Sequence, residues 1–498
     1  MEGFLHEVIG RELRRRHGVG MMEGKLKPVH VANALMRAEH GTVGRMSDLK
    51  MLMTATASKE TSEARLNAAQ QMLEASRDRW GRLGEEQDLR RSTLVSKVLP
   101  LLRTILATDA AAFGTSPDQS SFSSPTALTV TGDPSDDHAG EFVHRLWSGF
   151  GEPGMRLHLL DLLRDTSAPD RDLATVDDLT AVLAPLADDV RERKTTEWRF
   201  ADLDGSGTSS VAEALRAAAA DLGTYERHAR PNPIASLQRI VTLASISIFF
   251  HAATRGAEWA GYPRRILLLD ASGTRLSPVA AASELLVTRM MEDGRAYMAD
   301  VLTELLKETR EDWVQEPAGA LAELARNKAA KKGGTISTKV LAEVIDEISD
   351  AGGSIADELP RQLVEQVDGA SGRSLDGFLR LFGVRCGLLY PQQKNPNKRL
   401  VPADRTLEVL AVSTFDAAGR QLEYRDFLDA LHDRWSIVVG GRPEDGALLA
   451  AAGAEVDSAS LAENSERMLS RLEALGLARR LADSVAVVGM MEDDQQHA

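Results

Sequence analysis

The last hundred residues constrain the fold most, because their apolar side chains change period in a fixed order along the chain. Residues 405–415, a stretch that starts at Leu422 and residues 461–475 carry apolar side chains at helical spacing. A short strand is predicted over residues 435–439. Two apolar runs on either side of a turn at residues 482–484 predict a β-hairpin. The helices and the hairpin therefore follow the order helix, helix, helix, hairpin.

That order is the order of a winged helix, and we predict a winged-helix-like module over residues 401–498. A winged helix often reads DNA with its third helix in the major groove. The charged residues expected on the exposed face of the third helix are Glu463, Glu466, Glu473, Arg467 and Arg471. The module holds 9 arginines against 18 aspartates and glutamates, a net charge of −9. Because carboxylates repel the phosphates of DNA, we expect protein contacts from this module rather than DNA readout.

The rest of the chain predicts a mainly α, multi-domain helical protein. Its 498 residues exceed one ordinary core. Aromatic residues make up only 5% of the chain, while Ala, Leu, Arg, Asp and Glu dominate, which favours helices over sheets. The predicted parts are an N-terminal helical domain (1–111), a Ser-, Pro- and Gly-rich linker or long loop (112–140), a central helical domain with a short strand (141–315), a helical domain (316–400) and the winged-helix-like module (401–498).

The cysteine content and the apolar stretches predict a cytoplasmic protein outside membranes. A single cysteine, Cys386, excludes an internal disulfide and a multi-cysteine zinc site, and it fits a reducing compartment. The N-terminus has no apolar core of a signal peptide. Polar residues interrupt the most apolar stretch, residues 234–253, so we predict a buried helix there and no membrane span.

The sharpest local motif, residues 202–213 (DLDGSGTSSVAE), resembles the calcium-binding loop of the EF-hand family. The resemblance implies Ca²⁺, the one cofactor considered, and the ligands Asp202, Asp204, Ser206, Thr208, Ser210 and Glu213. The motif departs from the family at Ser209, where an aliphatic residue usually pairs two loops, and the sequence offers no second loop. The alternative, an Asp/Gly/Ser turn that ends one helix and caps the next, is favoured.

Basic clusters give a second set of candidate residues. Residues 1–110 carry 18 lysines and arginines against 14 acidic residues, although the whole chain has a net charge of −15. The candidate nucleic-acid contacts are Arg11, Arg14, Arg15, Arg16, Arg326, Lys328, Lys331, Lys332, Arg479 and Arg480. No aromatic residues alternate with them to stack on bases. A solvated surface is therefore the alternative interpretation of each cluster.

Catalytic motifs are scarce. Asp270 at the end of residues 266–270 resembles the strand-end aspartate of haloacid-dehalogenase-like phosphatases and of von Willebrand A domains, but we interpret it as a strand followed by a turn. Glu141 and His144 share one helical face, which we interpret as a solvated helix start. The sequence contains no P-loop, HExxH, GxSxG or dinucleotide-binding fingerprint. We therefore do not expect an enzyme of a familiar kind.

Three stretches together resemble a group of bacterial proteins: residues 231–240 (PNPIASLQRI), residues 265–270 (RILLLD) and residues 381–391 (LFGVRCGLLYP), which lead into the terminal module. They are similar to uncharacterised accessory proteins of multi-gene phage-defence systems linked to DNA methylation or phosphorothioation. In such systems the ATPase, methyltransferase and nuclease activities belong to other subunits. The resemblance implies a structural or adaptor subunit with protein partners.

The sequence thus predicts a non-enzymatic structural or adaptor subunit of a multi-protein complex in anti-phage defence. Two alternatives stay open. One is a nucleic-acid-binding regulator that uses the basic N-terminus and the winged helix. The other is a calcium-responsive protein with a single EF-hand-like loop.

Overall fold

A computed structural model gives the fold of the chain. It describes residues 2–21, 26–44, 63–64, 67–68, 71, 111–112, 121–122, 126–149, 154–168, 191–192, 210–228, 232–327, 338–371, 374–392, 395, 397–414, 421–481 and 485–489. Over these residues the protein is mainly helical, which confirms the mainly α part of the predicted fold class.

The chain divides into two compact units, each built from segments that are distant in sequence. Unit 1 comprises Met1–Gly24, Phe200–Asp221 and Ile246–Ala498, and unit 2 comprises Lys25–Arg199 and Leu222–Ser245. This division differs from the predicted one, which placed a linker at residues 112–140. Those linker residues belong to unit 2, and Thr131, Asp133 and Asp136 within them are buried.

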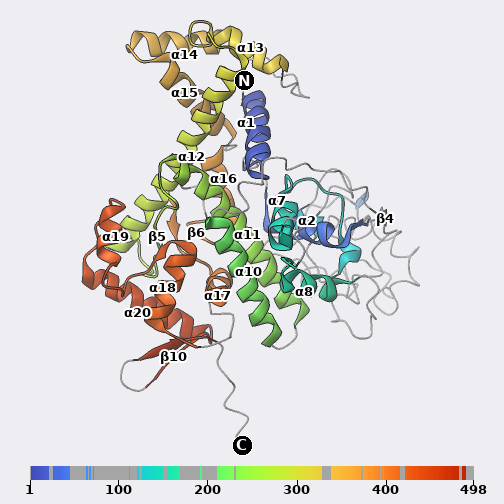
Figure 1. The fold of residues 1–498 in the computed structure, drawn as a ribbon, viewed down its shortest axis with the longest axis vertical. Helices are drawn as coiled ribbons and strands as arrows, with labels where there is room; N and C mark the ends of the chain where they lie inside the picture. The colour runs from blue at the N-terminus through green and yellow to red at the C-terminus, as the bar shows by residue number, and fades with distance from the viewer. Residues whose placement is uncertain are drawn as a thin grey trace, which may run out of the picture. The chain divides into compact units, whose positions relative to one another are not determined.

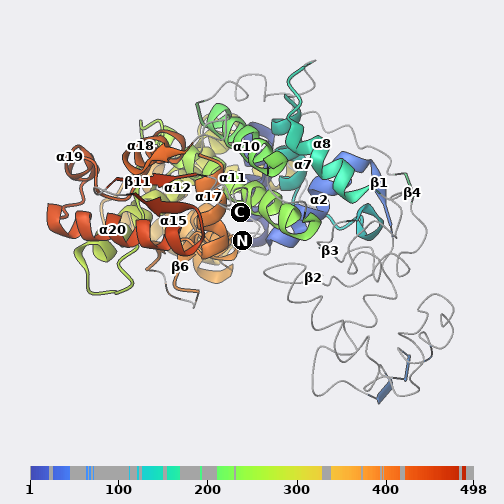
Figure 2. The same cartoon turned by 90° about the horizontal axis from the view of Figure 1, so that it is seen from below.

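Unit 2 is built around α2, whose residues 28–37 are all buried. Pro28 starts this helix at a position that needs no backbone N–H, and Gly41 ends it with a φ of +66°. Helix α7 packs on α2 (Figure 2), and the two backbones approach closely at Gly140, where a Cβ would lie 2.6 Å from the Ala34 Cβ. The elements of this unit are α2 (Pro28–His40), β1 (Thr42–Val43), β2 (Ala111–Ala112), β3 (Ser121–Phe122), η4 (Ala127–Thr129), α7 (Ala139–Ser148), α8 (His158–Ser167) and β4 (Arg191–Glu192).

Two helices contribute residues to both units, α10 (Ser210–His228) and α11 (Pro233–Trp259). Helix α11 contains the stretch predicted as a buried helix, and that prediction is confirmed. By length and composition α11 passes as a candidate membrane span, but 72% of its most apolar window is buried inside the protein.

The longest helix of unit 1 is α12, which spans 32 residues and runs diagonally in Figure 1. Ser277 caps its start by accepting a hydrogen bond from the Ala280 amide, and Pro278 is its first residue. Helices α13, α15 and α16 pack on it. The helices of unit 1 before the last hundred residues are α1 (Glu2–His17), α12 (Pro278–Thr309), α13 (Pro317–Asn327), α14 (Thr338–Asp350), α15 (Ile355–Ser371) and α16 (Leu375–Arg385).

Short strands from distant parts of the chain meet in unit 1. The predicted strand near Asp270 is β5 (Leu267–Leu268), and it pairs in parallel with β9 (Ile437–Val438). A parallel bridge from Leu269 to Leu400 links β5 to β7 (Arg399–Leu400), which pairs antiparallel with β6 (Leu389–Tyr390). The strand predicted over residues 435–439 therefore joins residues 170 positions earlier rather than its neighbours in sequence.

The C-terminal module contains the three predicted helices and the predicted hairpin. On the apolar face of the second helix Phe427, Leu428 and Leu431 are buried, as are Leu461, Met468, Leu469 and Leu472 on the third. A three-stranded sheet has the order β10, β11, β8. The remaining elements are α17 (Asp404–Val412), β8 (Leu422–Glu423), α18 (Tyr424–Trp435), α19 (Asp445–Ala451), α20 (Ser458–Ala474), β10 (Ala478–Arg480) and β11 (Ala486–Val488). Strand β8 and helix α19 are additions to the predicted order.

Candidate functional site

Helix α20 is fixed to the strands of unit 1 by one buried amide side chain. The Asn464 Nδ2 donates to the carbonyl oxygens of Leu269 and Val439, each at 2.7 Å, and its Oδ1 accepts from the Ala271 amide at 2.8 Å. These bonds satisfy backbone groups where β5 and β9 end. Next to them the chain passes under α20 at Gly440, whose φ is +105° and where a Cβ would clash with the Leu461 carbonyl. One face of α20 is therefore used by the protein's own interior.

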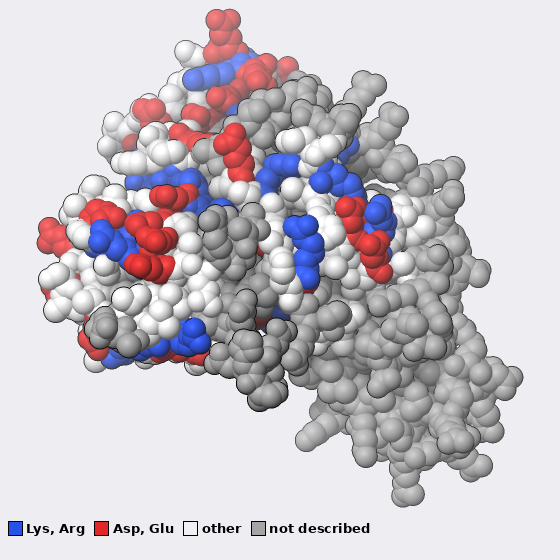
Figure 3. Space-filling model, turned by 60° about the horizontal axis from the view of Figure 1, so that its bottom comes forward, with Lys and Arg blue, Asp and Glu red and all other residues white. Residues whose placement is uncertain are grey.

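On its outer side, α20 carries arginines that are neutralised within the module. Arg467 pairs with Glu463 at 2.7 Å, and Arg471 pairs with Asp404 at 2.9 Å. Among the predicted nucleic-acid contacts, Arg480 lies between two carboxylates of α20, Glu466 and Glu473. Figure 3 shows blue and red atoms interspersed over the C-terminal module instead of one basic surface.

Between α20, the start of α18 and the hairpin lies a groove of about 710 Å³, which we call the hairpin groove. Its lining residues are Glu423, Tyr424, Arg425, Gly441, Ala462, Ser465, Glu466, Leu469, Arg480, Leu481, Val485 and Ala486. On the hairpin side, Leu481 and Val485 are joined by a backbone hydrogen bond of 2.7 Å and remain 42% and 40% exposed. The groove thus combines apolar side chains on its rim with the ion pair of Glu466 and Arg480.

A tyrosine fixes the floor of the groove. The Tyr424 hydroxyl donates to the Ser465 carbonyl at 2.8 Å and accepts from the Ser465 hydroxyl at 3.2 Å. Burial raises the pKa of Tyr424 above its ordinary value, so this phenol stays protonated. Within the described lining, Glu466 is held by Arg480 and no nucleophile faces a general base.

Asp270 lies just after β5, where the chain turns, in agreement with the interpretation of a strand followed by a turn. Its carboxylate pairs with Arg399 and accepts hydrogen bonds from the Ser272 amide at 2.8 Å and the Ser272 hydroxyl at 2.5 Å. Asp270 is 1% exposed. Both of its oxygens are therefore engaged, which leaves no free carboxylate for nucleophilic attack.

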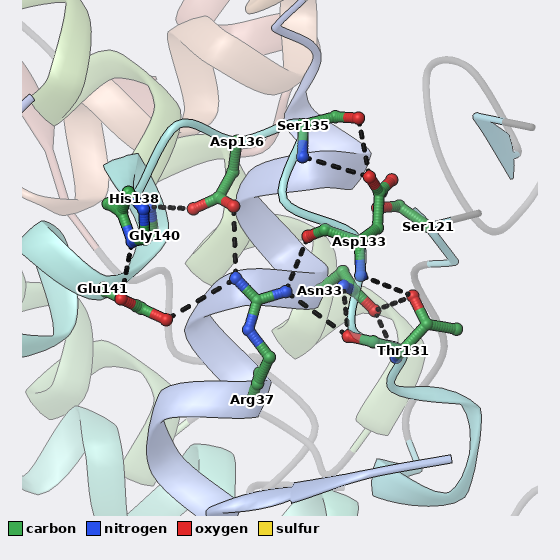
Figure 4. Close-up of polar contacts among 10 residues, drawn as sticks. All are labelled: Asn33, Arg37, Ser121, Thr131, Asp133, Ser135, Asp136, His138, Gly140 and Glu141. Atoms are coloured by element: carbon green, nitrogen blue, oxygen red, sulfur yellow. Dashed lines mark hydrogen bonds and ion pairs between the residues drawn. The ribbon is translucent and has the colours of Figure 1, made fainter. Parts of the chain in front are cut away.

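Unit 2 contains a buried polar network centred on Arg37 (Figure 4). Its guanidinium donates to the carbonyl of Asp133 at 2.7 Å and to the Asp136 carboxylate at 3.1 Å, while the other Asp136 oxygen accepts from the Gly140 amide. Asn33 exchanges hydrogen bonds with the backbone of Thr131. Burial raises the pKa of Asp136, although Arg37 opposes this effect. These bonds hold the segment from Thr131 to Gly140 against α2, so the network stabilises the fold.

The predicted solvated start of α7 is partly enclosed. His138 contacts Glu141 at 2.9 Å, and His144 contacts Glu39 at 3.0 Å, where the Glu39 side chain is 3% exposed. Hydrogen bonds from His144 and Arg156 outweigh the effect of burial and lower the pKa of Glu39. The roles of Glu39 and Arg37 were not predicted from the sequence. The only indication that the sequence offers is that both charged residues stand near the end of a mostly apolar helix.

The N-terminal basic cluster lies on α1, mostly beside carboxylates. Arg11 pairs with Glu7 at 2.9 Å, while Arg15 and Arg16 both pair with Glu12 at 2.7 Å. Arg14 also lies on α1, Arg326 is exposed near the end of α13, and Arg479 is exposed on β10. Lys328, Lys331 and Lys332 lie outside the described residues. The structure therefore does not bring these candidates together into one described basic surface.

Most of the calcium loop also lies outside the described residues, namely Asp202, Asp204, Ser206 and Thr208. Ser210 begins α10, and Glu213 is exposed in its first turn. Across the part of the chain that the structure describes, no group of three or more His, Cys, Asp or Glu residues is arranged to hold a metal ion. Calcium binding stays a prediction. Calorimetric titration of the wild-type chain and the Asp202→Ala variant with Ca²⁺ tests it, and no heat at millimolar Ca²⁺ rejects it.

The chain was compared with protein-family models, with curated proteins and with solved structures. None of the three comparisons finds a match.

Proposed function

We propose that this protein is a non-enzymatic adaptor or structural subunit that binds a partner protein through its C-terminal winged-helix-like module. The hairpin groove carries this proposal. It joins two exposed aliphatic side chains, Leu481 and Val485, to a concave surface beside α20. Exposed apolar side chains beside a depression that also holds polar groups are typical of protein-contact sites.

Electrostatics supports a protein partner over DNA. Arg467, Arg471 and Arg480 would meet phosphates in a DNA-reading winged helix, but each is paired with a carboxylate of the module. Binding phosphates would break these pairs and bring the same carboxylates close to the DNA backbone. The module's net charge of −9 adds an unfavourable long-range field.

The resemblance to accessory proteins of phage-defence systems gives the proposal a context. The partners would be the subunits that carry the ATPase, methyltransferase or nuclease activity. The test is co-purification of the tagged full-length chain with the products of neighbouring genes. A chain that remains a monomer and copurifies with none of them contradicts the proposal.

The groove is tested by the double variant Leu481→Asp/Val485→Asp. Placing two carboxylates on the apolar rim should reduce capture of the partner by at least tenfold, because each would be desolvated at the interface. The matched control is Leu276→Asp/Leu285→Asp, which changes two exposed leucines of unit 1 outside the groove. Equal loss of the partner in both double variants would remove the groove from the proposal.

A nucleic-acid-binding regulator is the second candidate, favoured by one observation. Arg425 and Arg479 are exposed, and no ion pair of either is seen among the residues that the structure describes. An electrophoretic mobility shift with duplex and single-stranded DNA at about 50 mM salt tests this candidate. A salt-sensitive shift that Arg425→Ala/Arg479→Ala weakens would favour it, and no shift at this salt would end it.

A further inference from the structure

The C-terminal end of α1 docks through a histidine that is enclosed by two other helices of unit 1. The His17 Nε2 lies 2.5 Å from the Tyr297 hydroxyl on α12, and its backbone carbonyl accepts from His251 Nε2 on α11 at 3.0 Å. The His17 ring lies 5.8 Å from the Tyr297 ring and 6.4 Å from the His251 ring. Both His251 and Tyr297 are at least 91% buried. One ring of α1 therefore touches both helices.

The hydrogen-bond directions at this contact assign a neutral His17. The Tyr297 hydroxyl also bonds the Arg16 guanidinium, which can only donate. A neutral His17 completes this arrangement, because its unprotonated Nε2 can accept the phenol proton. The His17 carbonyl can only accept, so His251 carries its proton on Nε2. A protonated His17 would present a second donor to a hydroxyl that already accepts from Arg16.

The charges around His17 also oppose its protonation. Arg16 on α1 and Arg255 on α11 are the cations that act on it, and Glu12 is the opposing carboxylate. The Arg255 side chain is 5% exposed, and its Nη2 has no hydrogen-bond partner. Its carboxylate partner, Glu258 at 3.0 Å, is 39% exposed. On α12, Glu304 is engaged by Arg16 at 2.7 Å.

We propose that His17 is an acid-sensitive latch, which releases α1 from unit 1 when its ring takes up a proton. Release would free Arg16 from Glu304 and would expose the apolar face of α1, formed by Leu5, Val8, Ile9 and Leu13. The helix would then present an apolar stripe together with its arginines. This inference is independent of the hairpin groove.

The direction of the effect follows from proton linkage. Burial, reinforced by Arg255 and Arg16, lowers the pKa of His17 from 6.5 to about 3. The docked state therefore binds the proton more weakly than the released state. The stabilisation of docking is fully present above pH 6.5 and is lost as the pH falls from 6.5 towards 3. Between pH 7.5 and pH 5.0, this linkage multiplies the released fraction by about 30.

Hydrogen exchange of the full-length protein, corrected for intrinsic rates, measures this release. We expect the protection of α1 amides to fall by about 30-fold more between pH 7.5 and pH 5.0 in the wild type than in His17→Gln. Glutamine keeps an acceptor for Tyr297 and does not titrate. Because His251 is present in both proteins, its own titration cancels in this comparison. The matched control, His6→Gln on the same helix, should behave as the wild type.

Helix α20 serves as an internal reference within the same unit. Loss of α1 protection in the wild type while α20 stays protected supports the latch. Simultaneous loss in both helices, an equal pH dependence in His17→Gln or unchanged α1 protection at pH 5.0 overturns it. If His17→Gln fails to fold, His17→Asn, which also does not titrate, takes its place in the comparison.

Discussion

Asp270 and Arg399 form an ion pair whose side chains are 1% and 7% exposed, where water cannot replace a lost partner. Removing one partner leaves the other charge buried and unpaired. We predict that Asp270→Ala lowers the free energy of unfolding by about 3 kcal/mol or more. Urea denaturation measures the change. The matched control is Arg480→Ala, which breaks a pair on an exposed surface and should change the urea midpoint far less than Asp270→Ala.

The Glu12 carboxylate makes the stability of the protein depend on pH below the range in which histidine titrates. Burial alone would raise its pKa, but hydrogen bonds from Arg15 and Arg16 outweigh burial and lower the pKa from 4.5 to about 2. The stabilisation from Glu12 is therefore present above pH 4.5 and is lost as the pH falls from 4.5 to 2. In Glu12→Gln, stability measured by denaturant titration should decline less steeply over this interval. An identical acid profile in both proteins would contradict this account.

At the scale of single residues, the sequence located Asp270 but not its partner. The end of an apolar run marks a carboxylate at the end of a strand. Arg399, which neutralises it, stands 129 positions later in a segment with no pattern that points to β5. Pairing across such a separation depends on tertiary contacts that local periodicity does not encode.

At the scale of elements, one buried side chain, that of Asn464, fixes the position of α20. Asn464 is 1% exposed and makes three hydrogen bonds to backbone groups near the ends of β5 and β9. We predict that Asn464→Ala costs about 3 kcal/mol of unfolding free energy, because buried backbone groups would be left without partners. Ser470→Ala, at an exposed position of the same helix, should change stability by less than about 0.5 kcal/mol.

The helices of the C-terminal module were predictable, whereas the pairing of β9 was not. Apolar side chains at helical spacing identified α17, α18 and α20, since each buries one face. Strand β9 has two residues, and both are buried. So short an apolar run does not reveal its partner. The hairpin groove could not be predicted either, because it forms where β8, α20 and the hairpin meet.

At the scale of the whole molecule, the division into two units predicts that one unit can be destabilised without the other. The Arg37 network lies entirely within unit 2, where Arg37 is 3% exposed. Arg37→Ala should lower the hydrogen-exchange protection of α2 and α7 by at least tenfold, since Asp136 would lose its cation. Helices α18 and α20 of unit 1 should keep their protection. An equal loss in all four helices would show that the units unfold together.

The segment predicted as a linker or long loop, residues 112–140, shows a limit of composition as a guide to burial. Its Ser, Thr and Asp content favours solvent exposure, yet Thr131, Asp133 and Asp136 lie in the interior of unit 2. Here they bind Asn33 and Arg37 of α2 instead. A polar segment can be buried when another element supplies its hydrogen-bond partners, and composition alone does not show this.

The pairing of β5 with β9 also has a consequence during translation. Strand β5 leaves the ribosome about 170 residues before β9. At about 5–20 residues per second, this strand waits roughly 10–30 seconds for its parallel neighbour. Throughout that time one edge of an apolar strand has no native cover. The nascent chain therefore carries an aggregation-prone edge until β9 has been synthesised, and a C-terminally truncated product would retain that open edge permanently.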